Sequence, residues 1–485
     1  MSQNAARVVF PGFKFGIDDP ALAETLVDLG VGGFCLYGGS IPEVAEMTAR
    51  LQARARRPLL FSADYEDGVA SQTPGGTPFP SNMGLGAAGD PALARKKGEL
   101  TAVESAALGV RWVFAPVVDL ATEPDSLIVN VRAFGDEPGP VARLARAYIE
   151  GLKSQGVLSC LKHYPGHGHT SKDSHLELPT VKVSEDVLAK RELAPYRELA
   201  EAADAVMTAH LMVPAMDKKL PISLSPTAVS KTLRREFGFE GLVSTDALSM
   251  EAIAGKWGDM EAAELAVAGG ADVILVPQEP KGFLYAWLKK AASDPALAAA
   301  LKTAEERLDR VMKAAGSVGT PAPELVGCLR HMEAAQALAE KCLAWCGAPA
   351  GPLPKAVSYL EADSEDPADW AGGPFLEELR ALGIAAEPWP QAGSAKPLIV
   401  GCFVRPRAYS GRIDYEAEVV ARLRKALAGA PGGAVVSFGN PFVLKSFPKS
   451  PGLCSFAGDA LAQKAAARAL AGRIPVTGRM PVRWT

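Results

Sequence analysis

Short apolar runs recur along the first 280 residues, and most are separated by longer stretches rich in Ala, Leu, Glu and Arg. Runs that are apolar on both sides of the extended chain are typical of strands buried in a parallel sheet, and the intervening composition favours helices. We predict strands at residues 8–10, 32–37, 58–64, 112–119, 157–163, 205–210, 241–246 and 271–276. Eight such strands alternating with helices indicate an α/β fold of the (β/α)₈ TIM-type barrel class.

Two breaks in composition divide the rest of the chain. Residues 316–323 and 347–354 are rich in Gly and Pro, with a helical pattern between them. Beyond the second break, apolar runs at 356–360, 397–403 and 434–438 predict further strands. We therefore expect a catalytic barrel at 1–320, a helical linker at 321–354 and a smaller α/β sandwich domain at 355–485.

Five successive predicted strands end in an ionisable residue. These strand ends carry Asp64, Asp119, Lys162 with His163, His210 and Asp246. Catalytic groups of barrel enzymes gather at the carboxyl ends of the strands. A single polar residue after a strand could cap the next helix, but a series of five predicts one shared site.

A histidine-rich stretch follows the fifth predicted strand. Four of the six histidines lie within residues 162–175, at positions 163, 167, 169 and 175. Histidine changes charge near neutral pH, so it suits proton transfer and metal binding. A surface loop that is rich in histidine by chance is the alternative.

The candidate residues permit two kinds of chemistry. Asp246 could attack an electrophilic carbon while His175, oriented by Asp173, donates and recovers a proton. Glycosidases normally use two carboxylates for these tasks. Alternatively, His167 and His169 could bind a divalent ion together with the histidines and the aspartate at the strand ends, as in a metal-dependent hydrolase.

The stretch Lys-His-Tyr-Pro-Gly-His-Gly-His-Thr-Ser-Lys-Asp-Ser-His at residues 162–175 resembles the signature of glycoside hydrolase family 3. It is most similar to the NagZ-type branch of β-N-acetylglucosaminidases. Segments at 114–119, 130–135, 207–210 and 244–250 resemble further family motifs in the right order. The resemblance covers nearly all of residues 1 to 315.

The resemblance implies a role for each matching residue. Asp246 would be the nucleophile, and His175 with Asp173 the acid/base pair. His167 and His169 would shape the loop, and no metal or cofactor is implied. The implied substrate-binding residues are Asp64, Arg132, Lys162, His163 and His210, the last of them behind the residues that touch the sugar.

This sequence departs from the family pattern in two ways. Where the recycling enzymes usually continue Gln-Glu-Gly-Gly-Arg after the aspartate, this chain has Tyr-Glu-Asp-Gly-Val at 65–69, so a sugar-gripping arginine is missing and Asp67 replaces a glycine. The chain is also longer than a lone barrel, and its segments at 435–442 and 477–482 resemble the family's second α/β domain.

The function expected from these residues is that of a retaining exo-β-N-acetylglucosaminidase, or β-N-acetylhexosaminidase, which removes terminal GlcNAc from cell-wall or chitin-derived saccharides. A β-N-acetylglucosaminide phosphorylase is an alternative, because a histidine acid/base repels phosphate less than a carboxylate does. A β-glucosidase of the same family, a metal-dependent barrel hydrolase and a non-catalytic sugar-binding protein are the others.

Composition limits the classes of partner and the cellular compartment that we expect. A net charge of −4 does not favour a nucleic-acid partner, and no apolar run is long enough to span a membrane. The start of the chain does not resemble a secretory signal. Seven scattered cysteines are typical of reduced thiols in a cytoplasmic protein, which fits peptidoglycan recycling. The expected partner is a small carbohydrate substrate, and the oligomeric state is left open.

Overall fold

The computed structural model describes residues 3–170, 176–316, 322–362, 371–390, 394–406 and 413–483. Its contacts divide the chain into two compact units. Unit 1 contains Met1–Thr77, Ala94–Leu120 and Glu137–Cys328, and unit 2 contains Pro78–Leu93, Ala121–Asp136 and Leu329–Thr485. Two short segments from the N-terminal half of the chain therefore belong to the same unit as the C-terminal residues.

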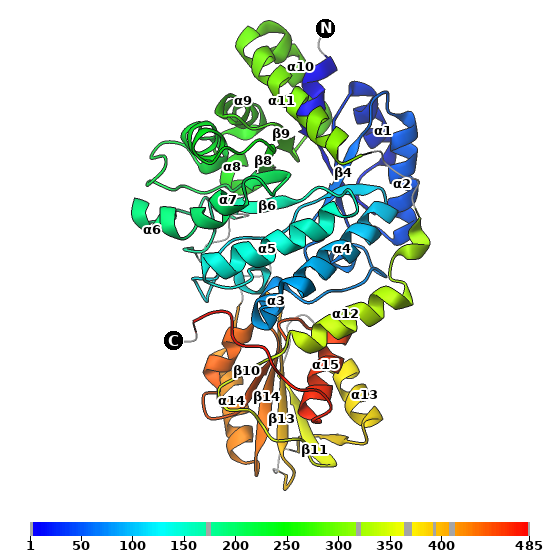
Figure 1. Cartoon of the computed structure of the whole chain (residues 1–485), viewed down its shortest axis with the longest axis vertical. Coiled ribbons are helices and arrows are strands. Elements are labelled where there is room, and N and C mark those ends of the chain that lie inside the picture. The colour runs from blue at the N-terminus through cyan, green and yellow to red at the C-terminus, as the bar shows by residue number, and fades with distance from the viewer. Residues whose placement is uncertain are drawn as a thin grey trace. The chain divides into compact units, whose positions relative to one another are not determined.

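Unit 1 is built on two parallel sheets (Figure 1). The first has the order β1-β9-β8-β7-β6 and the second the order β2-β3-β4-β5. Their strands are β1 (Val9–Phe10), β2 (Gly12–Lys14), β3 (Gly33–Tyr37), β4 (Leu60–Ala63), β5 (Val110–Val113), β6 (Cys160–Tyr164), β7 (Ala205–Thr208), β8 (Leu242–Ala247) and β9 (Val273–Leu275).

Helices connect the strands of unit 1 and give the parallel order its crossovers. The α-helices are α1 (Pro20–Leu29), α2 (Ile41–Arg54), α4 (Pro91–Ala107, whose first turn belongs to unit 2), α5 (Pro138–Lys153), α6 (Glu185–Lys190), α7 (Leu193–Leu199), α8 (Glu251–Ala254), α9 (Gly258–Gly269), α10 (Pro280–Ser293) and α11 (Pro295–Ala314). A π-helix, η5 (Thr227–Glu236), and the 3₁₀ turns η1 (Gln3–Val8), η2 (Val69–Ser71), η4 (Ile222–Leu224) and η6 (Pro323–Leu325) complete the unit.

Backbone hydrogen bonds link the two sheets of unit 1 at both edges. Beside β5 and β6, parallel bridges join Trp112 to Leu158 and Val117 to Lys162. At the other edge, the Gly32 amide donates to the Val9 carbonyl, beside the pairing of β2 with β3.

Side chains from both sheets fill the space between the strands of unit 1. Phe10, Trp112 and Phe114 pack edge to face, with ring centroids 5.7 and 4.9 Å apart. Cys160 and Met207 belong to the same buried cluster. These buried side chains leave the strand ends as the place where we expect a site.

Unit 2 is organised around one sheet with the order β10-β15-β14-β13-β11-β12, in which only the β10–β15 pair is antiparallel among the described strands. Figure 1 shows α13 and α15 on one face of this sheet and α14 on the other. Its elements are α3 (Asn82–Ala88), η3 (Asn130–Arg132), α12 (Leu329–Lys341), β10 (Ala344–Cys346), β11 (Ala356–Glu361), α13 (Gly373–Ala381), β12 (Ala385–Pro388), β13 (Leu398–Val404), α14 (Ala417–Ala428), β14 (Gly433–Gly439), η7 (Pro441–Ser446), β15 (Gly452–Cys454) and α15 (Ala460–Leu470).

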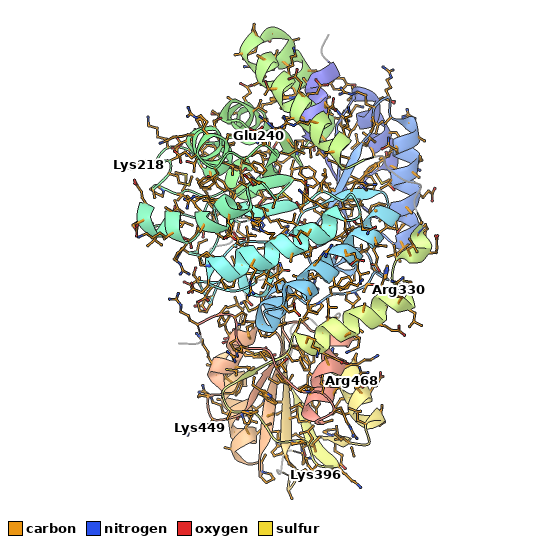
Figure 2. The ribbon with its side chains drawn as sticks, in the orientation of Figure 1. Lys218, Glu240, Arg330, Lys396, Lys449 and Arg468 are labelled. Atoms are coloured by element: carbon orange, nitrogen blue, oxygen red, sulfur yellow. The ribbon has the colours of Figure 1, made fainter. Side chains whose placement is uncertain are left out.

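One arginine ties three helices of unit 2 together. Arg468 of α15, labelled in Figure 2, donates to Glu340 of α12 at 2.6 Å and to Glu378 of α13 at 2.7 Å. Two carboxylates on one planar guanidinium fix the relative rotation of these helices.

The predicted α/β class with parallel strands is confirmed, and each of the eight strands predicted in the N-terminal half has a counterpart. The fourth is shifted, because β5 ends at Val113 and Pro116 follows in a loop. The short strand β2 was not predicted. Strand β2 begins at Gly12, and Pro11 separates it from β1. No helix in the described part of the chain is both long and apolar enough to cross a bilayer.

Helices α4 and α5 run side by side (Figure 1) because each has a glycine at the point of closest approach. A Cβ at Gly98 would lie 2.3 Å from the Tyr148 carbonyl oxygen, and one at Gly151 would lie 2.2 Å from that of Arg95. Both positions are therefore closed to any side chain unless the helices separate.

We expect Gly151→Ala to destabilise the protein by about 1–3 kcal/mol, because the strain of overpacking exceeds the gain of about 1 kcal/mol in helix propensity. Thermal unfolding would show this as a Tm lowered by several degrees. Gly282→Ala, in the open surface of α10, is the control and should leave Tm unchanged or slightly higher. Equal effects of the two substitutions would contradict the packing argument.

Candidate active site

Four of the five ionisable strand ends lie just after or within strands that run parallel in unit 1. Asp64 follows β4, Lys162 and His163 lie in β6, His210 follows β7, and Asp246 lies near the end of β8. Parallel strands bring their carboxyl ends to one edge of a sheet.

Lys162 joins two of these strand ends. Its ammonium lies 2.6 Å from Asp64 Oδ1 and 2.5 Å from Glu66 Oε1, and its side chain is only 2% exposed. A buried ammonium requires opposite charge close by, and two carboxylates supply it. Asp64 remains 31% exposed, so this cluster presents charged hydrogen-bonding groups to solvent at the strand ends.

Asp119 anchors the backbone that follows β6. Its buried carboxylate accepts hydrogen bonds from the His163 amide at 3.2 Å and the His167 amide at 2.8 Å. It also accepts one from His163 Nδ1 at 2.7 Å, so this ring nitrogen carries a proton. Burial alone would raise the pKa of Asp119, but the charges of both histidines and these hydrogen bonds lower it to about 2.

His210 supports the end of β8. Its Nε2 donates to the Ala247 carbonyl at 3.0 Å, and its Nδ1 lies 2.8 Å from Ser223 Oγ. The ring is fully buried. These contacts fix the backbone next to Asp246, whose Oδ1 accepts a hydrogen bond from the Ala247 amide at 2.8 Å.

Tyr37, at the end of β3, has a pKa that two carboxylates of the strand ends help to raise. Burial is the largest cause that raises the pKa of Tyr37 well above its ordinary value, and the negative charges of Asp64 and Asp246 add to it. Both carboxylates must be near the phenol to act on it. Asp64, which follows β4, and Asp246, in β8, are therefore both within electrostatic reach of Tyr37.

The loop after β6 has a second anchor at His169. Its Nε2 lies 2.9 Å from Glu192 Oε1, a distance that allows a charge interaction although the angles are not those of a hydrogen bond. The Glu192 side chain, between α6 and α7, is fully buried.

The profile of the "Glycosyl hydrolase family 3 N terminal domain" matches residues 14–314, which include all of these strand ends. The chain belongs to glycosyl hydrolase family 3.

Family relatives with a curated name support the same assignment. "Beta-hexosaminidase A" of Pseudoalteromonas piscicida is 31% identical over 285 residues, or 53% of this chain, which spans about half (48%) of that relative. "Beta-hexosaminidase" of Neisseria meningitidis serogroup A is 36% identical over 269 residues, covering 53% of this chain and 74% of that protein.

A solved family 3 structure matches the whole length of the chain. It is a glycoside hydrolase family 3 β-N-acetylglucosaminidase from Paenibacillus sp. str. FPU-7, with 29% sequence identity and a TM-score of 0.87. The match covers 100% of this chain and 99% of that one.

Three further predicted site residues are not among the described residues of unit 1. Asp173 and His175 fall outside the described residues. Arg132 ends the 3₁₀ turn η3, which belongs to unit 2. Within the described ranges, no group of three His, Cys, Asp or Glu side chains is arranged to hold a metal ion.

Sequence reasoning missed Tyr37, Glu66 and Glu192. Glu66 lies two residues after Asp64, and this spacing could have suggested a shared direction. Tyr37 ends an apolar run and gave no charge signal. Glu192 lies among many charged residues of a helical stretch, and nothing local distinguishes it from its exposed neighbours.

We expect Asp119→Asn to lower stability at neutral pH by about 2 kcal/mol, since the carboxyl pKa falls from 3.8 to about 2 on folding. This contribution is present above pH 4 and is lost as pH falls toward 2. Urea unfolding of both proteins from pH 7 to pH 3 measures it. The difference between them should shrink as the pH falls below 4. A difference that does not change with pH would contradict the role of the charge.

Proposed function

We propose that the protein is a retaining exo-β-N-acetylglucosaminidase, or β-N-acetylhexosaminidase, that releases terminal GlcNAc from cell-wall or chitin-derived saccharides. The observation that carries the proposal is the placement of the Asp64–Lys162 ion pair and of Asp246 at strand ends of unit 1, with Lys162 in β6 and Asp246 in β8 of the same parallel sheet. The names of the relatives support the sugar class.

Asp246 is the nucleophile of the proposed reaction. Its carboxylate attacks the anomeric carbon, and the bond to the leaving oxygen breaks as His175 donates a proton to that oxygen. Asp173 orients His175 and stabilises its charged form. In the second step His175 takes a proton from water, the hydroxide attacks the same carbon, and Asp246 is released with the original configuration restored.

The sugar is held by charged groups around this carbon. We assign its hydroxyl contacts to Asp64, Lys162, His163 and Arg132, since carboxylates accept from hydroxyl groups and cations donate to them. Glu66 holds the Lys162 ammonium in place through a second ion pair. We assign His210 to the support of the Asp246 strand end, because both of its ring nitrogens contact neighbouring residues.

We also propose that the two sheets of unit 1 form one closed (β/α)₈ barrel. The bridges beside β5 and β6 and the hydrogen bond between Gly32 and Val9 support closure at both edges. The predicted catalytic domain at 1–320, linker at 321–354 and α/β sandwich domain at 355–485 belong to this proposal.

Peptidoglycan recycling in the cytoplasm is the setting that we infer. All seven cysteines are free thiols, and most are buried. Free thiols are usual in a reducing compartment.

The first test is the initial rate of hydrolysis of p-nitrophenyl β-N-acetylglucosaminide against the matching β-glucoside. We expect the N-acetyl substrate to be preferred, Asp246→Ala to lose at least about 10⁴-fold in kcat, and His175→Ala to lose about 10²–10⁴-fold. A preference for the glucoside, or full activity in both variants, would refute the assignment.

Glu240→Ala is the matched control for the nucleophile. Glu240 precedes the same strand at its opposite end, is 82% exposed and is labelled in Figure 2. Its removal should leave the rate unchanged. Repeating the assay with phosphate separates hydrolysis from phosphorolysis, because only a phosphorylase releases a sugar phosphate. A metal ion bound at one per chain would favour the metal-dependent alternative.

A further inference from the structure

The segment that carries Arg132 is folded by the C-terminal part of the chain. Ala121, Val129 and Ala133 lie in one buried cluster with Val435 and Phe442. The Asp136 amide donates to the Pro481 carbonyl at 3.3 Å. This segment follows β5 in sequence, yet its core contacts come from residues about 300 positions later.

Asn440 is the centre of a buried hydrogen-bond network in this unit. Its side chain is buried, and its Nδ2 donates to the Ile413 carbonyl at 2.6 Å. Its Oδ1 accepts from the Phe442 amide at 3.0 Å and from Asn130 Nδ2 at 3.1 Å. Its own carbonyl accepts from Ser437 Oγ. A buried amide with this many partners has one allowed orientation.

Asn130 links this hydrogen-bond network to the turn that contains Arg132. Its backbone has φ of +33°, a conformation that a residue with a side chain rarely adopts without support. The bond to Asn440 holds the side chain of Asn130, the first residue of the 3₁₀ turn η3. In the same turn the Arg132 amide donates to the Val129 carbonyl at 2.9 Å, and the guanidinium Nη1 of Arg132 donates to the Ile128 carbonyl at 2.6 Å.

A second buried amide holds the other side of the turn. Asn82 Nδ2 donates to the Arg132 carbonyl at 2.8 Å. Asn82 comes from α3, which is also part of unit 2. Two buried asparagines, from distant parts of the sequence, thus fix the backbone from which the Arg132 side chain projects.

We propose that Asn440 is a positioning residue for sugar binding, which acts through Asn130 to hold Arg132 in its binding orientation. The C-terminal residues thereby set the affinity for the sugar, although they need not touch it. The inference rests on the proposed function only in taking Arg132 as a sugar contact.

The test compares KM and kcat for p-nitrophenyl β-N-acetylglucosaminide in Asn440→Ala, Asn130→Gly, Arg132→Ala and the Asn440→Ala/Arg132→Ala double variant. We expect Asn440→Ala and Asn130→Gly each to raise KM about 10-fold with kcat little changed. Glycine accepts a positive φ, so Asn130→Gly removes the amide link while keeping the turn. If Asn440→Ala fails to fold, Asn130→Gly still tests the proposal.

The double variant distinguishes positioning from general damage. If Asn440 acts through Arg132, Asn440→Ala should add no further rise in KM once Arg132 is absent. The same rise in both backgrounds, or no rise in a folded Asn440→Ala protein, would overturn the proposal. An unchanged KM in Arg132→Ala would also overturn it, whereas the proposed function would still stand on the loss of activity in Asp246→Ala.

Gln463→Ala is the matched control. Gln463 is another buried amide of unit 2, and it bonds the Gly458 carbonyl at 2.8 Å and the Phe375 amide at 3.1 Å. Its loss should lower Tm but leave KM unchanged. A comparable rise in KM in this variant would show that any loss of a buried amide in the unit weakens binding, and would refute a specific role for Asn440.

Discussion

The buried carboxylate of Asp119 is the constraint on which the arrangement after β6 depends. Three N–H groups converge on it, two from His163 in β6 and one from His167 just after that strand. A carboxylate can accept all three at once, whereas any neutral side chain of that size would leave at least one buried donor without a partner. The backbone from His163 to His167 therefore keeps a single conformation. This conformation fixes the end of β6, which carries Lys162 and His163.

Ion pairs between opposite charges then fix other ionisable side chains at the strand ends. The Lys162 side chain is deeply buried, and Asp64 and Glu66 place two carboxylates beside its one ammonium group. In the mechanism that we propose, this excess of carboxylates favours hydroxyl donors, and Asp246 stabilises positive charge that develops at the anomeric carbon. The groups are held before substrate arrives, so little reorganisation is needed.

Much of unit 1 could be predicted because its signals are local. Buried parallel strands form continuous apolar runs, and the ionisable residues that follow them are visible in the sequence as strand ends. Lys162 with Asp64, and His163 with Asp119, are pairs between predicted strand ends. Glu192 and Asn440 could not be found this way, because their importance arises only from burial against segments far away in the chain. The assignment of Ala121–Asp136 to unit 2 had no signal either, since its core partners lie at the other end of the sequence.

The distribution of unit 2 along the chain has a consequence for synthesis. Residues 78–93 and 121–136 leave the ribosome well before the strands and loops that bury them, which run from β13 to the segment at 477–482. At about 5–20 residues per second, the second early segment waits roughly 20–70 s for its partners. During that time Val129 and Ala133 have no core to join, so the N-terminal half emerges with apolar surface that chaperones can bind. Unit 2 is then completed by the capture of two waiting segments, rather than by the folding of one continuous stretch of chain.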